Sequence, residues 1–390
     1  MKSTVIIRKC DSYEPAAVQD AVAAAVEAAG GIGSIVKPGD RVLLKINLLN
    51  AAKPERAVVT HPEVVRAMIR LVKSAGGEVV VGDAPGLDLP GHGKKVLRTS
   101  GAAQVCEEEG VIARPFAEKG FVEVTESTNR LMQTLHIARE VAEADVVIGL
   151  SKAKSHMQAV YTGAIKNFFG TLPSKDRKRS HSYVNLQDFS ESLVDIFAAC
   201  KPTFGLMDGI MAMEGRGPSD GNPRKLGLVL ASHDFVALDR VTSTCMGYDR
   251  LVIPHIDLAA KRGLGVGNLD RITIDGPAIA EVRQEFKAPP NTAALPIPAF
   301  IQRFALGLFK VEPLVTVRCV TCGHCASVCP VEAIEMGPEM AQIDYSKCIG
   351  CFCCHELCPI SAILERRSLL AHLFTLFGRI QDRLRKKQID

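Results

Sequence analysis

Residues 146–170 read VVIGLSKAKSHMQAVYTGAIKNFFG, and they join a run of β-branched residues to a block rich in lysine, histidine and glycine. The run Val146–Gly149 has the composition of a buried β-strand. A polar block directly after such a strand is typical of a ligand site at the carboxyl end of a parallel sheet. This stretch therefore predicts both a class of fold and the place of a site.

Outward from this stretch, short β-branched runs alternate with longer helical patterns over residues 1 to about 288. Such alternation predicts an α/β fold, with a mostly parallel sheet and flanking helices. The predicted strands are Val5–Ile7, Val42–Lys45, Glu78–Val81, Val146–Gly149, Thr203–Met207, Leu226–Leu230 and Arg271–Ile274, and the predicted helices lie near Ala16–Ala29, Pro62–Ser74 and Leu186–Cys200.

The composition is that of a folded protein and not of a nucleic-acid binder. The 390 residues allow two or three domains, and 47 Lys and Arg against 43 Asp and Glu leave a formal charge of only +4. No stretch approaches the roughly 20 apolar residues of a membrane-spanning helix. The amino terminus has no recognisable export signal, and we therefore expect a cytoplasmic protein.

Four segments are predicted along the chain. Residues 1–288 form the α/β domain, 289–313 a Pro-rich linker with a docking helix, and 314–365 a cysteine-rich domain of α+β type. Residues 366–390 have the pattern of a basic amphipathic helix. We expect that helix to pack on the protein or on a partner, and contact with a membrane surface is the alternative.

Cysteine is the most informative residue type, because nine of the 13 cysteines fall between Cys319 and Cys358. Two copies of a C-x2-C-x2-C-x3-C-P pattern are offset by 29 residues throughout, which indicates an internal duplication. Zinc sites use two separated pairs of cysteines, and disulfides are typical of exported proteins, so neither suits this pattern as well as iron–sulfur clusters. The eight positions are Cys319, Cys322, Cys325, Cys329, Cys348, Cys351, Cys354 and Cys358.

This segment resembles the bacterial two-cluster ferredoxins, a resemblance that implies two 4Fe-4S clusters. It further implies that Cys319, Cys322, Cys325 and Cys358 hold one cluster, and that Cys348, Cys351, Cys354 and Cys329 hold the other. Two residues depart from the family pattern: Phe352 stands where glycine is usual, and Cys353 is an additional thiol.

The first domain carries candidate residues for an anionic ligand. Lys154 and Lys166 bring positive charge, and His156 offers a nitrogen ligand or a proton carrier. The pair Thr162–Gly163 would let the backbone approach an anion. Lys45, Asn47 and Asp83 lie in or beside the turns after two further predicted strands, and the basic loop Lys175–Arg179 ends near His181.

A second cluster follows the predicted strand Thr203–Met207. Asp208 and Glu214 are candidate catalytic acids there, and the glycines around them predict a flexible loop. Neither a Walker-type phosphate loop nor a nucleophile elbow occurs in the chain.

Five stretches resemble the domain-of-unknown-function family 362, whose members often carry a ferredoxin end. The resemblance implies an α/β domain followed by a two-cluster domain, and it names no reaction. The stretches are VKPGDRVLLKINLL, GDAPG, KAKSHMQAVYTGAIKNFFG, MEGRGPSDG and ASHDFVALDRV.

The segment from His156 to Lys166 is also similar to a block of the nickel-pincer lactate racemase family. That resemblance implies His156 as a metal ligand, Lys166 as the anchor of a nucleotide cofactor and His181 as a further ligand. The racemase block Asp-x-Thr-Arg-Pro has no counterpart, because Lys45–Ile46–Asn47 stands in its place.

Three functions follow as hypotheses. The first is an oxidoreductase that relays electrons between its clusters and an anionic substrate or cofactor in the first domain, with His156, Lys166, Asp208 and Glu214 as catalytic residues. The alternative is a non-catalytic electron carrier whose first domain docks a redox partner protein. The second alternative, which the racemase resemblance implies, is a nickel-pincer racemase-like enzyme that uses a metal cofactor.

Overall fold

The structure is a computed structural model that describes residues 2–87, 89–183, 185–290 and 311–367. It consists of two units, Met1–Pro289 and Pro290–Asp390, which we describe separately. Most of the predicted docking helix and nearly all of the predicted basic amphipathic helix at residues 366–390 lie outside the described residues. Within the described ranges, no helix combines the length and the apolar character needed to cross a membrane.

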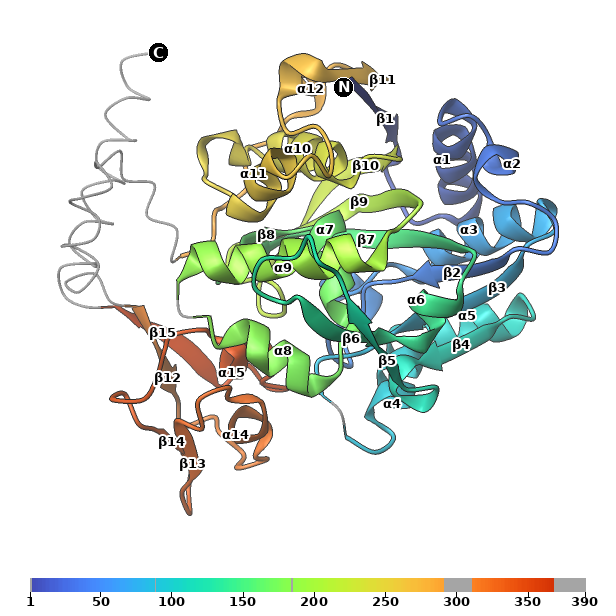
Figure 1. The fold of residues 1–390 in the computed structure, drawn as a ribbon. Helices are drawn as coiled ribbons and strands as arrows, with labels where there is room; N and C mark the ends of the chain where they lie inside the picture. The colour runs from blue at the N-terminus through green and yellow to red at the C-terminus, as the bar shows by residue number, and fades with distance from the viewer. Residues whose placement is uncertain (1, 88, 184, 291–310, 368–390) are drawn as a thin grey trace, which may run out of the picture. The chain divides into compact units, whose positions relative to one another are not determined.

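The first unit is built on a nine-stranded, mostly parallel sheet (Figure 1), which confirms the predicted α/β class. The path runs β11-β1-β10-β9-β7-β2-β3-β4, with the short β8 paired to β7. Strand β10 runs antiparallel to both of its neighbours, whereas β9, β7, β2, β3 and β4 are parallel to one another. The strands are β1 (Ser3–Lys9), β2 (Arg41–Lys45), β3 (Glu78–Asp83), β4 (Ile112–Pro115), β7 (Val146–His156), β8 (Val160–Thr162), β9 (Phe204–Glu214), β10 (Asn222–Ser232) and β11 (Ile272–Asp275).

Helices cover both faces of this sheet, and a separate hairpin of β5 (Phe121–Thr125) and β6 (Thr134–Ala138) lies beside it. One core contains side chains of α1, α3, α4 and α5, and the other contains side chains of α7, α9, α10 and α11. The helices are α1 (Pro15–Ala28), α2 (Ile32–Ile35), α3 (Pro62–Ser74), α4 (His92–Thr99), α5 (Ala102–Glu108), α6 (Arg139–Glu143), α7 (Ala164–Asn167), α8 (Ser174–His181), α9 (Leu186–Cys200), α10 (Phe235–Cys245), α11 (Pro254–Lys261) and α12 (Ile279–Val282).

The two cores arise because successive side chains of a strand point to opposite faces of the sheet. In β2, Leu43 belongs to one core, whereas Val42 and Leu44 belong to the other. In β9 the adjacent residues Leu206 and Met207 divide in the same way. A strand that is buried on both faces reads as a continuous apolar run, which is why these strands are visible in the sequence.

The seven predicted strands and three predicted helices all correspond to observed elements, and α3 and α9 have the predicted bounds. Local chemistry explains the starts of both helices. Helix α3 begins with Pro62, and His61 Nδ1 accepts a hydrogen bond from the N–H of Glu63 at 3.2 Å. Helix α9 is capped by Asn185, whose Oδ1 accepts from the N–H of Asp188 at 2.7 Å.

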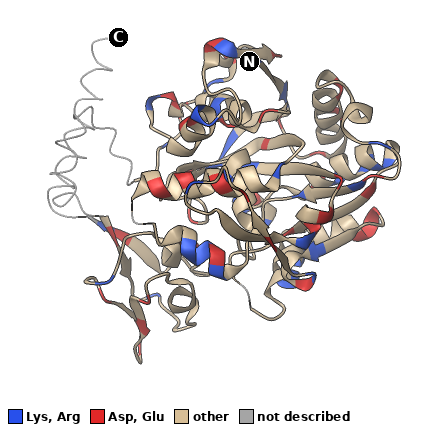
Figure 2. Ribbon diagram, in the orientation of Figure 1, with Lys and Arg blue, Asp and Glu red and all other residues tan. Residues whose placement is uncertain are grey.

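Three local predictions were wrong. Strand β7 does not end near Gly149 but continues to His156, and β9 continues to Glu214, so Asp208 and Glu214 lie in a strand and not in a flexible loop. Pairing of β7 with β9, and of β9 with β10, continues past the polar residues Lys152 and Asp208, because ladder hydrogen bonds do not require apolar side chains. The expected basic loop is helix α8, whose lysine and arginine positions are blue on the ribbon of Figure 2.

The second unit is small and consists of two antiparallel strand pairs with two short helices. Strand β12 (Val311–Val315) pairs with β15 (Ile363–Arg367), and β13 (Ile334–Met336) pairs with β14 (Ala341–Ile343). The helices are α14 (His324–Val328) and α15 (Cys353–Glu356). Its core includes cysteines from both repeats, such as Cys325, Cys329 and Cys354, so the sulfurs are part of the packing.

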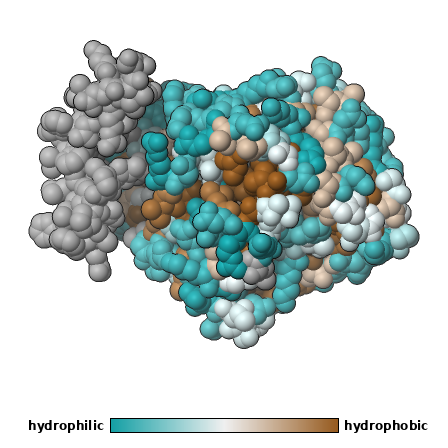
Figure 3. All heavy atoms as spheres, turned by 90° about the horizontal axis from the view of Figure 1, so that it is seen from above, coloured by the Kyte–Doolittle hydropathy of each residue, from teal (hydrophilic) through white to brown (hydrophobic). Residues whose placement is uncertain are grey.

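Exposed apolar side chains are distributed unevenly between the units. Figure 3 shows one face of the molecule, where a hydrophobic patch is surrounded by hydrophilic residues. Single exposed apolar residues are normal in folded proteins. The described large apolar residues that are exposed are Leu89, Ile112 and Val252 in the first unit and Leu314, Val317, Val320 and Met336 in the second.

Candidate functional site

The carboxyl ends of β2 and β3 meet in a buried ion pair. Lys45 Nζ lies 2.8 Å from Asp83 Oδ1, and both side chains are almost fully buried. Lys45 also donates to the carbonyl of Ile46 and to Asn167 Oδ1, while Asp83 accepts from the N–H groups of Leu48 and Ala84. Burial lowers the pKa of Lys45 and raises that of Asp83, and the opposite charge of the partner works against each shift. These two predicted binding residues therefore bond each other and fix the turns.

A second buried ion pair joins β7 to β9. Lys152 and Asp208 are cross-strand neighbours, and Lys152 Nζ lies 2.9 Å from Asp208 Oδ2. Asp208 also accepts from the hydroxyl of Tyr13 at 2.7 Å and from the N–H of His61 at 3.0 Å. The predicted acid is thus held by three donors from separate elements. The carboxylate of Asp208 therefore accepts hydrogen bonds that hold these segments together.

Lys154 and Asn47 are brought together, as neighbouring parallel strands would place them. Lys154 Nζ donates to Asn47 Oδ1 and to the carbonyl of Val58, each at 2.7 Å. Glu214 lies at the far end of β9, where its Oε2 accepts from Arg224 Nη1 at 2.9 Å and from the N–H of Lys287 at 3.0 Å. These contacts link Glu214 to β10 and to the chain after α12.

The sequence predicts that the backbone at Thr162–Gly163 approaches a bound anion. In the structure, the anion next to this backbone is the carboxylate of Asp239. Asp239 accepts hydrogen bonds from the N–H groups of Ala164 and Ile165 at 2.6 and 2.9 Å. A Cβ atom at Gly163 would lie 2.1 Å from Asp239 Oδ1, so only glycine fits there. Burial raises the pKa of Asp239 to about 6, although these N–H groups oppose the shift.

His156 has a defined tautomer. Its Nδ1 accepts hydrogen bonds from the N–H groups of Gln158 and Ala159, each at 3.1 Å. The neutral ring therefore carries its proton on Nε2. A metal-binding histidine usually donates from its other ring nitrogen, so this tautomer suits a hydrogen-bond donor at Nε2 better than a metal ligand.

His181 and Lys166 lie in the same neighbourhood through aromatic contacts. His181 Nδ1 is 3.0 Å from Gln158 Oε1, and its ring contacts Phe169 and Phe189 with centroids 5.0 Å apart in each case. Lys166 Nζ lies 4.7 Å from the centroid of the Phe169 ring. The structure therefore gathers the end of β7, the end of α7 and the end of α8 around one buried group of side chains.

His255 joins this group from α11, and the sequence carried no signal for it. The ring is fully buried and lies parallel to that of Tyr161, with centroids 6.4 Å apart. Burial is the main cause that lowers the pKa of His181 and of His255 to about 3 and holds that of His156 well below its ordinary value. The positive charge of Lys166 lowers all three further, which places the three imidazoles within its field.

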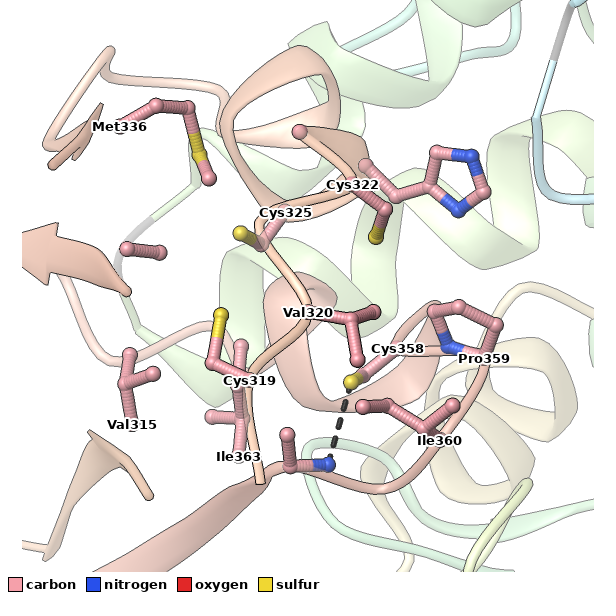
Figure 4. A pocket seen from close by; sticks show the side chains of 14 residues that line it. Val315, Cys319, Val320, Cys322, Cys325, Met336, Cys358, Pro359, Ile360 and Ile363 are labelled. Atoms are coloured by element: carbon pink, nitrogen blue, oxygen red, sulfur yellow. Dashed lines mark hydrogen bonds between the residues drawn. The ribbon is translucent and has the colours of Figure 1, made fainter. Parts of the chain in front are cut away.

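The described part of the second unit contains a pair of cavities, each lined by four of the eight repeat cysteines. One cavity is lined by Cys319, Cys322, Cys325 and Cys358 (Figure 4). The other is lined by Cys348, Cys351, Cys354 and Cys329, together with Cys353. Each cavity thus takes three cysteines from one repeat and the last cysteine of the other.

The cysteine sulfurs line the walls of the two cavities. In the described ranges, no three His, Cys, Asp or Glu side chains lie close enough together to hold a single metal ion. A 4Fe-4S cluster has four irons, each bound by one cysteine, so a cavity walled by four sulfurs fits such a cluster. Backbone N–H groups also point at sulfur: Ala333 N–H donates to Cys329 Sγ and Ala362 N–H to Cys358 Sγ, at 3.2 and 3.1 Å.

The backbone repeats the duplication that the cysteines predict. Positive φ angles occur in pairs that are 29 residues apart: Thr321 with Gly350, Gly323 with Phe352 and Glu332 with Ser361. Phe352 adopts a φ of 60° where its counterpart Gly323 has 76°. The turn therefore keeps its shape although its residue has changed from the usual glycine.

Comparison with known proteins finds a matching family for each of the two units. Residues 42–244 match the domain of unknown function DUF362, and residues 318–362 match the 4Fe-4S dicluster domain. The chain belongs to the DUF362 family. This DUF362 chain is 37% identical to the thylakoid-associated protein sll1697 of Synechocystis sp. over 268 residues, which are 68% of this chain and 81% of that protein. The carboxyl-terminal segment of the DUF362 chain, residues 318–362, is that of an iron–sulfur protein.

Among solved structures, the DUF362 chain is similar to the lactate racemase apoprotein from Thermoanaerobacterium thermosaccharolyticum. The identity is 15% and the TM-score is 0.38, and the match covers 60% of this chain and 57% of that one. A likeness of this size carries no argument about chemistry.

Proposed function

We propose that this protein binds two 4Fe-4S clusters in its second unit and exchanges electrons with an anionic substrate or cofactor bound in its first unit, as an oxidoreductase. The observation that carries the proposal is the pair of cavities, each walled by three cysteines of one repeat and the last cysteine of the other. When bound, such clusters accept and donate single electrons.

The protein's own residues would hold and tune the clusters. Cys319, Cys322, Cys325 and Cys358 would hold one, and the second set of four would hold the other. The N–H groups of Ala333 and Ala362 each donate to a ligand sulfur, and such hydrogen bonds stabilise negative charge on the sulfur. Apolar residues such as Val315, Ile363 and Ile343 line the cavities and limit the access of water.

The anionic ligand is assigned to the buried group around His156 and Lys166. Lys45 pairs with Asp83 and Lys152 pairs with Asp208, so we assign these residues to the support of the site. His156 presents an Nε2–H donor, and the charge of Lys166 acts on every imidazole of the group. The roles of His156 and Lys166 are therefore to bind and orient an oxyanion. We further propose that electrons come from or go to a redox partner protein in the cytoplasm.

Metal analysis of protein purified without oxygen tests the cluster half of the proposal. About eight irons and about eight sulfides per chain are expected, with two reduction steps in a potentiometric titration. Four irons per chain, or zinc in place of iron, would contradict two clusters.

Anion binding tests the other half. Calorimetric titration with inorganic phosphate and with malonate should detect binding of at least one anion to the cluster-loaded protein, and Lys166→Ala should weaken it while the iron content stays unchanged. Equal binding by wild type and Lys166→Ala would contradict a ligand site at Lys166.

A further inference from the structure

His255 is one of a few buried polar residues in the described part of the first unit whose side-chain atoms lack a hydrogen-bond partner. Among the residues that the structure describes, neither of its ring nitrogens has a hydrogen-bond partner, although the ring is fully buried. A neutral imidazole has one N–H donor and one acceptor nitrogen, and leaving either buried without a partner destabilises the folded state. Buried polar groups in native proteins are nearly always satisfied, so such a residue indicates a group that binds there.

The position of His255 identifies the site to which it belongs. Its ring lies parallel to that of Tyr161, whose hydroxyl donates to Asp239 Oδ1 at 3.1 Å. Asp239 in turn holds the first N–H groups of α7, and Lys166 lies in the last turn of this short helix. One chain of contacts therefore connects His255 to the helix that carries Lys166.

The charge around the three imidazoles indicates the class of ligand. Lys166 acts on His156, His181 and His255 alike, Lys154 adds to its effect at His156, and Arg177 and Arg240 add to it at His181 and His255. These groups are all cations, and each disfavours a proton on the imidazole beside it. The same positive field attracts an anion.

We propose that His255 is a further ligand-binding residue of the site of His156, Lys166 and His181, and that it donates a hydrogen bond to an oxygen of a small oxyanion, a carboxylate or a phosphate. The inference rests on the proposed anion site and adds to it a residue from a helix that the sequence did not implicate. An oxyanion satisfies the buried N–H of His255, and its charge is balanced by the surrounding cations.

The test compares His255→Phe with wild type in the cluster-loaded protein. Phenylalanine keeps an aromatic ring against Tyr161 and removes both nitrogens. Titration with inorganic phosphate and with malonate distinguishes a phosphate from a carboxylate ligand. We expect His255→Phe to weaken binding of the preferred anion by about tenfold or more, and His255→Gln, which retains a donor, to weaken it less. The matched control is His233→Phe, because His233 is exposed and its ring nitrogens contact the carbonyls of Thr203 and Ala29.

The outcomes separate the inference from the proposed function. If Lys166→Ala weakens binding and His255→Phe does not, the role of His255 is overturned while the anion site stands. If neither anion binds wild type in the millimolar range, both the anion site and the inference fail. The proposal of two 4Fe-4S clusters is then still tested separately by the iron and sulfide content. Should His255→Phe not fold, His255→Gln is compared by the rise in melting temperature that each anion produces, and a rise equal to that of wild type overturns the inference.

Discussion

The two units hold their chemically interesting residues in opposite ways. Lys45 at the carboxyl end of β2 faces Asp83, and Asp208 in the middle of β9 faces Lys152, and each side chain finds its partners within the protein. In the second unit the repeat cysteines face two cavities instead of one another. Side chains that satisfy each other hold a scaffold, whereas side chains directed at a cavity or left without a partner are available for a ligand. By this criterion His255 belongs with the cysteines.

The largest expected effect follows from the crossed arrangement of the cysteines. Cys358→Ser should affect the same cluster as Cys319→Ser, because both residues line one cavity, although Cys358 lies in the other repeat. Each variant should lower the iron content from about eight to between about four and about seven per chain, and both should perturb the same electron paramagnetic resonance signal.

Cys329→Ser should perturb the other signal, and Cys200→Ser, at a buried thiol in α9, should leave the iron content unchanged. If Cys358→Ser and Cys348→Ser instead perturb one common signal, each repeat holds its own cluster and the crossed arrangement is wrong.

The second expected effect tests whether the Lys45–Asp83 pair serves the scaffold. Lys45→Met leaves Asp83 as a buried charge without its cation and should lower the free energy of unfolding of the first unit by about 3–5 kcal/mol. The double change Lys45→Met with Asp83→Leu should recover part of this loss, because no charge is left unpaired. Denaturant unfolding measures both.

The matched control for this pair is Lys94→Met, at an exposed ion pair in which Lys94 Nζ lies 3.1 Å from Glu118. This change should cost less than about 1 kcal/mol. If Lys45→Met is as stable as Lys94→Met, the Lys45–Asp83 pair does not hold the scaffold, and the proposed division into scaffold and ligand residues is wrong there.

The third effect is a dependence on pH. The folded pKa of Asp239 is about 6, above its ordinary value of 3.8, so between these values the folded state binds more protons than the unfolded state. Stability contributed by Asp239 therefore falls as the pH rises and is constant above the folded pKa. Asp239→Asn removes this dependence. The difference in unfolding free energy between the variant and wild type should move in favour of the variant by about 1 kcal/mol from about pH 5 to about pH 7. A difference that is the same at both pH values would show that the carboxyl has an ordinary pKa.

The smallest effect concerns the two repeats. Phe352 has a left-handed backbone, and so does Gly323 at the equivalent position, where a Cβ atom would contact nothing within 4 Å. Gly323→Ala should therefore destabilise the second unit by about 1 kcal/mol through backbone strain alone. For the same reason Phe352→Gly should lose its clusters in denaturant more slowly than Phe352→Ala. Equal rates for these two variants would mean that the turn relaxes.

Much of the fold was predictable because its signals are local. Strands buried on both faces are continuous apolar runs, and helices α3 and α9 carry their own caps, so the α/β class and the bounds of these helices followed from the sequence. The ends of β7 and β9 were not predictable. The last residues of β7 are mostly polar, and Asp208 and Gly209 interrupt the apolar run of β9. Both ends are held in the strand by pairing with a neighbour, which has no local signal.

The candidate site was only partly predictable for the same reason. His156 and Lys166 stand in one distinctive block, and the structure places them in one buried group with His181. His255 and Tyr13 are contributed by distant segments whose local sequence gives them no special character. Asp239 stands in the stretch ASHDFVALDRV, but its contact with α7 has no signal in that stretch.

The sequence by itself determined the eight cysteines and their duplication, because the ligand spacing and the tight turns are local properties of each repeat. It also determined the alternation of buried strands and covering helices. Only the tertiary structure decided which cysteines share a cavity and which lysines are neutralised by an aspartate. It also decided that the ring nitrogens of His255 have no hydrogen-bond partner among the described residues. Those outcomes depend on contacts between residues far apart in the chain, and the cost of burying a polar group is set by the partners that the fold brings to it.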